Sequence, residues 1–105
     1  LGRPYYARKD LPVSPEAKAR LARLSTKEVH PATLAGEPVL QVLDRATGNG
    51  APLGGIKVVA ANAWFAVRPS GTEDVAKVYA ESFLGEAHLE RVLEEATALL
   101  HKALA

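Results

Sequence analysis

The sequence contains no cysteine and no methionine, and only 6% of its residues are aromatic. Without cysteine, the chain can form no disulfide, no zinc site with thiolate ligands and no cysteine nucleophile. Without methionine, and with Leu1 as its first residue, the sequence does not begin as a translated chain would. We therefore expect it to be an excised or processed piece of a longer protein.

The sequence has no excess of either charge, because it contains thirteen Lys and Arg residues and twelve Asp and Glu residues, for a net charge of +1. General binding of polyanions needs a broad cationic surface, so we expect no nucleic-acid partner. Lys57, Asn62 and Arg68 interrupt the longest apolar stretches well short of the roughly 20 residues of a membrane span, so we expect no membrane partner. The lack of cysteine is compatible with a reducing compartment, and we expect a cytoplasmic protein.

The chain does have enough apolar residues for one core. Its 105 residues are 48% hydrophobic, which fits a single domain over 1–105 and leaves no room for a second. Apolar periodicity predicts five strands and two helices. The strands are expected at 4–9, 39–44, 56–61, 64–68 and 75–83, the helices at 14–24 and 86–104, a connection at 25–38 and a glycine-rich hairpin loop at 46–55.

The order of these elements predicts the fold class. Strand, helix, four strands and helix (β-α-β-β-β-β-α) indicate an α+β fold with a mostly antiparallel sheet and both helices on one face. In the last predicted strand, Ala76, Val78, Ala80 and Ser82 alternate with larger or charged residues. We expect this small aliphatic face to meet the helices, which leaves the other face of the sheet for binding.

The clearest chemistry lies in RPSGTE, between the last two predicted strands. The planar guanidinium of Arg68 can hold two oxygen atoms of one phosphate. Ser70 and Thr72 add hydroxyl donors two residues apart. Gly71 can adopt a positive φ, which lets backbone N–H groups turn toward an anion. These residue types in this order predict a phosphate-binding loop.

Lys77, on the strand that follows, can bring a second positive charge to the same end of the sheet. Glu73 and Asp74 oppose this prediction, because they place negative charge beside the proposed anion. Pro-Ser-Gly-Thr is also ordinary turn chemistry, with Arg68 as a solvated strand end. The residue types alone leave both interpretations open.

Other features point to no catalytic residue and no metal site in this chain. Gly48, Gly50 and Gly54 do not have the G-x-G-x-x-G spacing of a nucleotide-binding loop, which favours a hairpin linker. His88 and His101 lie on opposed faces of the predicted last helix, so they cannot share a metal ion. We expect them to be surface or capping residues.

Ser70 and Trp64 are two further candidates for chemistry. Ser70 has no histidine nearby in the sequence to act as its base, so a nucleophilic serine is not expected. Trp64, the only tryptophan, could form the wall of a sugar site. Core packing or cross-strand pairing is the more common use of such a residue.

Residues 64–85 (WFAVRPSGTEDVAKVYAESFLG) resemble the last domain of the α-D-phosphohexomutases, whose phosphate loop is R-x-S-G-T followed by a strand with a basic residue. Glu73-Asp74 and Lys77 are most similar to the bacterial phosphoglucomutase branch, which is specific for α-D-glucose phosphates. YYARKDLP, the LAGEP turn and GNGAPLGGIKVV extend the resemblance over most of the chain. The resemblance implies a TATA-box-binding-protein-like arrangement of the predicted elements.

For function, the resemblance implies an enzyme that interconverts α-D-glucose 1-phosphate and glucose 6-phosphate through a phosphoserine and glucose 1,6-bisphosphate. This chain would be its C-terminal phosphate-binding domain. Arg68, Ser70, Gly71 and Thr72 would hold the phosphate that is not being transferred, with support from Lys77. The expected partners are the phosphorylated sugar and the other domains of the same chain.

The sequence contains no phosphoserine loop and no aspartate-rich magnesium loop. The resemblance therefore implies that Mg²⁺ and glucose 1,6-bisphosphate belong to the full-length enzyme, and we expect this domain to bind no cofactor and to be inactive alone. Three alternatives stay open: the C-terminal domain of a phosphomannomutase-type enzyme, a stand-alone anion-binding module, and a nucleic-acid module that lays its open sheet face on a duplex.

Overall fold

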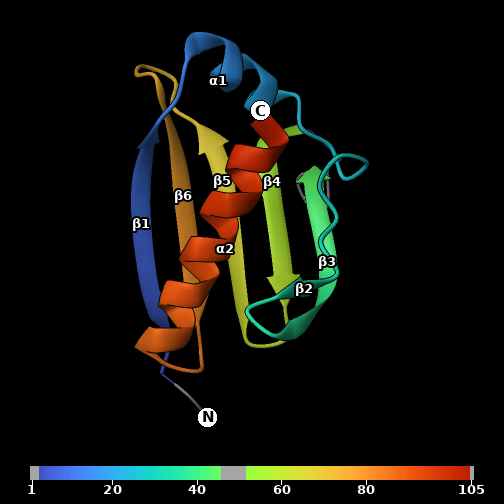
Figure 1. The fold of residues 1–105 in the computed structure, drawn as a ribbon, viewed down its shortest axis with the longest axis vertical. Helices are drawn as coiled ribbons and strands as arrows, with labels where there is room; N and C mark the ends of the chain where they lie inside the picture. The colour runs from blue at the N-terminus through green and yellow to red at the C-terminus, as the bar shows by residue number, and fades with distance from the viewer. Residues whose placement is uncertain (1–2, 46–51, 105) are drawn as a thin grey trace.

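The computed structural model describes residues 3–45 and 52–104, which form six strands and two helices (Figure 1). In chain order these are β1 (Tyr5–Pro12), α1 (Pro15–Ala22), β2 (Thr33–Leu34), β3 (Glu37–Arg45), β4 (Pro52–Ala60), β5 (Ala63–Pro69), β6 (Val75–Ser82) and α2 (Glu86–Leu104). This order confirms the predicted α+β class. It contains one short strand, β2, that the sequence pattern did not predict.

All six strands belong to one antiparallel sheet, in the spatial order β1-β6-β5-β4-β3-β2. The first strand thus pairs with the last, with Tyr5 opposite Ser82 and Pro12 opposite Val75. The hairpin predicted around Asn62 is confirmed, because β4 and β5 pair on either side of it. The side chain of Glu37 accepts two hydrogen bonds from Asn62, from the backbone N–H at 3.1 Å and from Nδ2 at 2.7 Å.

The expectation that 25–38 is only a connection is wrong for its last part. β2 pairs with the start of β3, with Thr33 opposite Pro38. Between these strands Ala35 has φ 48° and Gly36 has φ 87°, so both turn residues are left-handed, as a tight two-residue hairpin requires. A two-residue strand is too short to show any alternation in sequence, which is why the pattern did not predict it.

The other strand and helix boundaries differ by a few residues. β4 already includes 52–55, which the sequence had assigned to the glycine-rich loop; residues 46–51 of that predicted loop lie outside the described residues. Helix α1 ends at Ala22, earlier than the predicted Leu24. It begins as predicted, because Ser14 Oγ accepts a hydrogen bond of 3.0 Å from Ala17 N and Pro15 occupies the first turn.

Both helices cover one face of the sheet, and the core lies between them and that face, as predicted (Figure 1). α2 crosses β6 and β5, while α1 lies at one end of the sheet over β4, β5 and β6. The predicted small face of β6 is buried at every second residue from Ala76 to Ser82. The buried residues of α2 are Leu89, Val92, Ala96 and Leu100, at the three- and four-residue steps of a helical stripe.

His88 is neither a free surface residue nor a helix cap, so that expectation is wrong. Its Nδ1 lies 2.8 Å from the hydroxyl of Ser82, and its Nε2 lies 3.2 Å from the carbonyl oxygen of Ala35. The ring thereby joins the start of α2 to the end of β6 and to the β2–β3 turn.

Within residues 3–45 and 52–104, no helix is long and apolar enough to cross a bilayer.

Gly55 sets how closely β4 can approach β5. A Cβ atom at Gly55 would lie 2.0 Å from the carbonyl oxygen of Val67. Since both are backbone positions in paired strands, neither can move without separating the two strands. Overpacking of this kind costs about 1–3 kcal/mol. We expect Gly55→Ala to lower the free energy of unfolding by about 3 kcal/mol, measured by thermal or urea unfolding followed by circular dichroism.

Gly71→Ala is the matched control, because a Cβ there meets no atom within 4 Å. We expect its unfolding midpoint to equal that of the unmodified chain. Equal midpoints for both variants would contradict the assigned close approach of β4 and β5.

Candidate functional site

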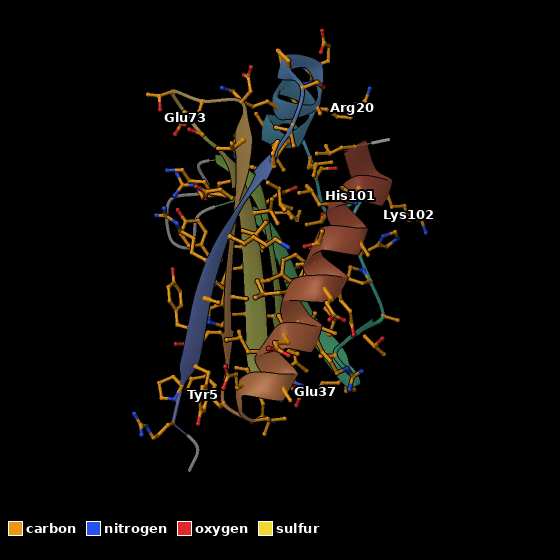
Figure 2. The ribbon with its side chains drawn as sticks, turned by 60° about the vertical axis from the view of Figure 1, so that its left-hand side comes forward. Tyr5, Arg20, Glu37, Glu73, His101 and Lys102 are labelled. Atoms are coloured by element: carbon orange, nitrogen blue, oxygen red, sulfur yellow. The ribbon has the colours of Figure 1, made fainter. Side chains whose placement is uncertain are left out.

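The predicted phosphate-binding segment connects β5 to β6. Residues 70–74, hereafter the 70–74 loop, follow Pro69 and precede Val75. The loop lies at the same end of the sheet as α1 (Figure 1), and Glu73 stands at that end in Figure 2. The backbone N–H of Ser70 donates to the carbonyl oxygen of Val75 at 3.0 Å, so the loop is closed at its base.

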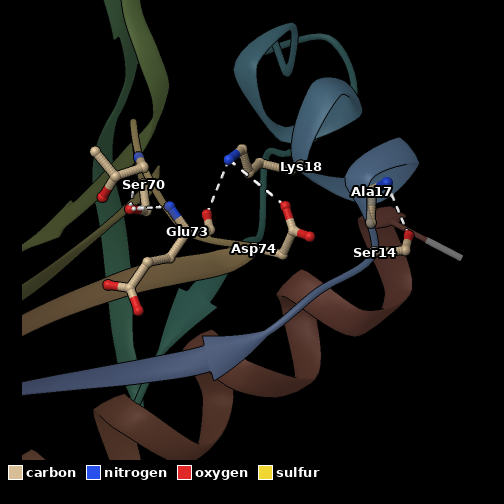
Figure 3. A network of polar contacts seen from close by, with 7 residues as sticks. Ser14, Ala17, Lys18, Ser70, Glu73 and Asp74 are labelled. Carbon is tan, nitrogen blue, oxygen red and sulfur yellow. Dashed lines mark hydrogen bonds and ion pairs between the residues drawn. The ribbon is translucent and has the colours of Figure 1, made fainter.

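Ser70 is the internal anchor of this loop. Its side chain is almost completely buried, with 4% of the residue exposed. The hydroxyl oxygen accepts hydrogen bonds from Thr72 N at 3.3 Å and from Glu73 N at 3.1 Å (Figure 3). A hydroxyl that accepts two bonds still has its own proton to donate. Ser70 therefore shapes the loop and retains one donor.

Gly71 and Thr72 form the exposed tip of the loop. Gly71 does not use the positive φ that a glycine allows. The N–H groups of Thr72 and Glu73 also turn toward Ser70 Oγ instead of outward. The reason is local: the buried hydroxyl competes for the donors that an open anion nest would present.

Arg68 and Lys77 face each other across β5 and β6. They are register partners, and the neighbouring pair Val67 and Val78 is buried against the helices. Because side chains alternate along a strand, Arg68 and Lys77 project from the open face. Two like charges directly opposite each other destabilise a sheet, and an anion between them removes that repulsion. Neither side chain forms an ion pair with any residue in the described ranges.

One acid in the same row of side chains could not be predicted from the sequence. Asp10 on β1 is the register partner of Lys77, and it lies 3.8 Å from Nε of Arg8. It therefore offsets part of the positive charge on the open face. No sequence signal could have identified it, because its position depends on the pairing of the first strand with the last.

Lys18 of α1 is the second residue that sequence reasoning missed. Its Nζ donates to the carbonyl oxygen of Glu73 at 2.8 Å and lies 3.7 Å from the carboxylate of Asp74 (Figure 3). The backbone N–H of Val13 also donates to the carbonyl oxygen of Asp74, at 3.0 Å. Contacts from Val13 and Lys18, at the start of α1, thus hold the 70–74 loop in place.

Trp64 lies on the open face, away from the core. Its Nε1 donates to Glu81 Oε1 at 2.9 Å, and Glu81 is its register partner on β6. Nζ of Lys57 lies 4.6 Å from the centroid of the indole ring, within cation–π range. Trp64 thus makes the cross-strand pairing that is common for such a residue. Its side chain is engaged by these two neighbours, Glu81 and Lys57.

No group of three His, Asp or Glu side chains in the described part of the chain has the arrangement of a metal site. His88 is engaged with Ser82 and Ala35, whereas His101 is an exposed residue near the other end of α2 (Figure 2). The site thus consists of a cationic pair and a closed polar loop at one end of the sheet. Two neighbouring cations have the charge to attract an anion.

Comparison with known proteins places this chain in a family. Residues 16–99 match the family described as "Phosphoglucomutase/phosphomannomutase, C-terminal domain", a match that includes the 70–74 loop and Lys77. The chain belongs to this family. It is also similar to a "Phosphoglucomutase" of Komagataeibacter xylinus, with 56% identity over 96 residues. That alignment covers 91% of this chain but 17% of the relative, so the chain spans less than a fifth of that enzyme's length.

The bonds of Ser70 predict a specific loss of order. In Ser70→Ala the N–H groups of Thr72 and Glu73 lose their acceptor, and a hydrogen bond of this type contributes about 1 kcal/mol. We expect amide hydrogen exchange at residues 72 and 73 to accelerate, and the free energy of unfolding to fall by about 1–2 kcal/mol.

Thr72→Ala removes a hydroxyl from the same loop and is the matched control. That hydroxyl is exposed and makes no hydrogen bond to another described residue. We expect its exchange rates and stability to match those of the unmodified chain. Equal protection of residues 72 and 73 in Ser70→Ala would show that its hydroxyl does not order the loop.

Proposed function

We propose that this chain, as a single domain over 1–105, is the substrate-phosphate-binding C-terminal domain of a phosphoglucomutase. The observation that carries the proposal is the placement of Arg68 opposite Lys77, beside a loop closed by Ser70. Family membership supports the same assignment. The domain's role is to hold the sugar phosphate by the group that is not being transferred.

Each residue of the site has a distinct task in this proposal. Arg68 holds two phosphate oxygen atoms with its planar fork, while Lys77 adds a point charge from the neighbouring strand. The hydroxyl protons of Ser70 and Thr72 donate to the remaining oxygen atoms. Gly71 has open space where a side chain would stand, which lets the ligand approach the backbone.

The full-length enzyme would interconvert α-D-glucose 1-phosphate and glucose 6-phosphate through a phosphoserine and glucose 1,6-bisphosphate. Mg²⁺ would assist phosphoryl transfer there. The described residues of this domain offer no set of ligands for that ion. The domain contributes by holding the substrate in register with the reacting groups. Alone, it binds the ligand and catalyses nothing.

Glucose phosphates are proposed over mannose phosphates because of the close relative. The family description includes both enzyme types, whereas the protein that is 56% identical is described as a phosphoglucomutase. We therefore propose glucose phosphates as the substrates of the enzyme that contains this chain. We propose the cytoplasm as its compartment. The near-neutral net charge of +1 supports a single anion site over a nucleic-acid surface.

Weak binding of glucose 6-phosphate by this chain tests the proposal. A few charge-assisted hydrogen bonds, reduced by desolvation and ordering, leave about 4 kcal/mol, which corresponds to a millimolar Kd. In an NMR titration, the amide signals of residues 68–73 and 77 are expected to shift first. Shifts confined to α2, or tighter binding of duplex DNA than of glucose 6-phosphate, would overturn the assignment.

Arg68→Lys tests whether the planar fork matters in catalysis. Lysine keeps the charge but cannot donate two parallel bonds, so transition-state stabilisation falls by about 1.4 kcal/mol, or tenfold in kcat/KM. The measurement is steady-state kinetics of a phosphoglucomutase that contains this domain. Arg23→Lys, at the exposed end of α1, is the control with expected unchanged kinetics. Equal values of kcat/KM for both variants would show that the planar fork of Arg68 does not contribute to catalysis.

A further inference from the structure

Lys18 of α1 occupies an unusual position relative to the phosphate loop. It lies 55 positions before Glu73 in sequence, yet its Nζ donates to that residue's carbonyl oxygen at 2.8 Å. The same Nζ lies 3.7 Å from Oδ1 of Asp74. Figure 3 shows the ammonium group between these two oxygen atoms, on the side of the loop that faces α1. A single cation thus contacts both acidic residues of the loop.

These contacts reduce the repulsion that the acidic residues of the loop would exert on a bound anion. Glu73 and Asp74 place two negative charges beside the proposed anion. The ammonium of Lys18 offsets the carboxylate of Asp74 and draws the carbonyl of Glu73 toward α1. In Figure 3 the Glu73 carboxylate points away from Lys18, so this contact is made by the backbone and not by a second ion pair. An anion at Arg68 therefore meets a loop whose negative groups are partly compensated.

The same contacts also hold the loop in place. Inside the loop, Ser70 Oγ accepts the N–H groups of Thr72 and Glu73. Outside it, Val13 N holds the carbonyl oxygen of Asp74 and Lys18 holds that of Glu73. Lys18 is 26% exposed and Asp74 is 59% exposed. The pair is therefore accessible enough to be changed without opening the core.

We propose that Lys18 is a positioning residue for phosphate binding: it fixes the backbone of the 70–74 loop and compensates Asp74, without touching the ligand. The proposal deepens the proposed function and rests on it. It assigns α1 a task in the site, although no residue of α1 belongs to the R-x-S-G-T motif. Helix α1 is itself aligned by the Ser14 cap, which Figure 3 shows beside the loop.

The test compares Lys18→Gln with Lys18→Arg in this chain, with glucose 6-phosphate as the probe. We expect Lys18→Gln to raise the Kd about fivefold, the effect of losing one partly exposed charged contact. Lys18→Arg keeps a charged donor and is expected to restore binding to within about twofold. Lys27→Gln removes the same charge from an exposed side chain outside α1 and controls for net charge.

A double variant separates the two contacts of Lys18. If charge compensation contributes, adding Asp74→Asn to Lys18→Gln should recover about half of the lost affinity in logarithmic terms. The remainder then belongs to the lost bond at the Glu73 carbonyl. A purely structural Lys18 would instead lower the unfolding midpoint and leave the Kd of the folded chain unchanged, which would overturn the proposal.

Loop order without ligand gives a readout that does not depend on the proposed function. We expect amide exchange at residues 72–74 to accelerate in Lys18→Gln but not in Lys27→Gln. If the unmodified chain binds no glucose 6-phosphate, the proposed function is wrong. Separately, equal amide exchange rates at residues 72–74 in Lys18→Gln and Lys27→Gln would show that Lys18 does not position the loop. If it binds the probe and Lys18→Gln binds equally well, only the role of Lys18 is overturned.

Discussion

The pairing of β5 with β6 is the interaction on which both the core and the site depend. Its register places Val67 opposite Val78 on the helix-covered face and Arg68 opposite Lys77 on the open face. Burial of the first pair beneath the helices thereby holds the second pair together. A slip of one residue would exchange the two faces, so the energy of the core also maintains the spacing of the cations.

The 70–74 loop illustrates how a short polar segment is held without a large buried surface. Ser70 supplies the internal acceptor, and the segment around Val13 and Lys18 supplies two external donors. The donors come from the first third of the chain because β1 pairs with β6, which brings the start of α1 beside the loop. The edge strand β1 thus contributes to the site although it contains none of the motif residues.

Much of the fold could be predicted, for identifiable reasons. The apolar stripe of α2 and the alternation along β6 repeat over many residues, so periodicity was sufficient. Ser14 and Pro15 marked the start of α1 through local chemistry. β2 could not be predicted, because two residues show no period and the strand exists only by pairing with β3. His88 was misjudged because Ser82 and the carbonyl of Ala35 meet it only in the folded chain.

The sequence by itself determined the residue types of the site and their order, since R-x-S-G-T and the lysine that follows lie close together along the chain. Only the tertiary structure decided how those residues are used. It turned the N–H groups of the loop toward Ser70, left Gly71 without a positive φ, and brought Asp10 and Lys18 to the site from distant segments. The physical reason is that hydrogen bonds and ion pairs depend on distances in space, which strand pairing sets and sequence spacing does not.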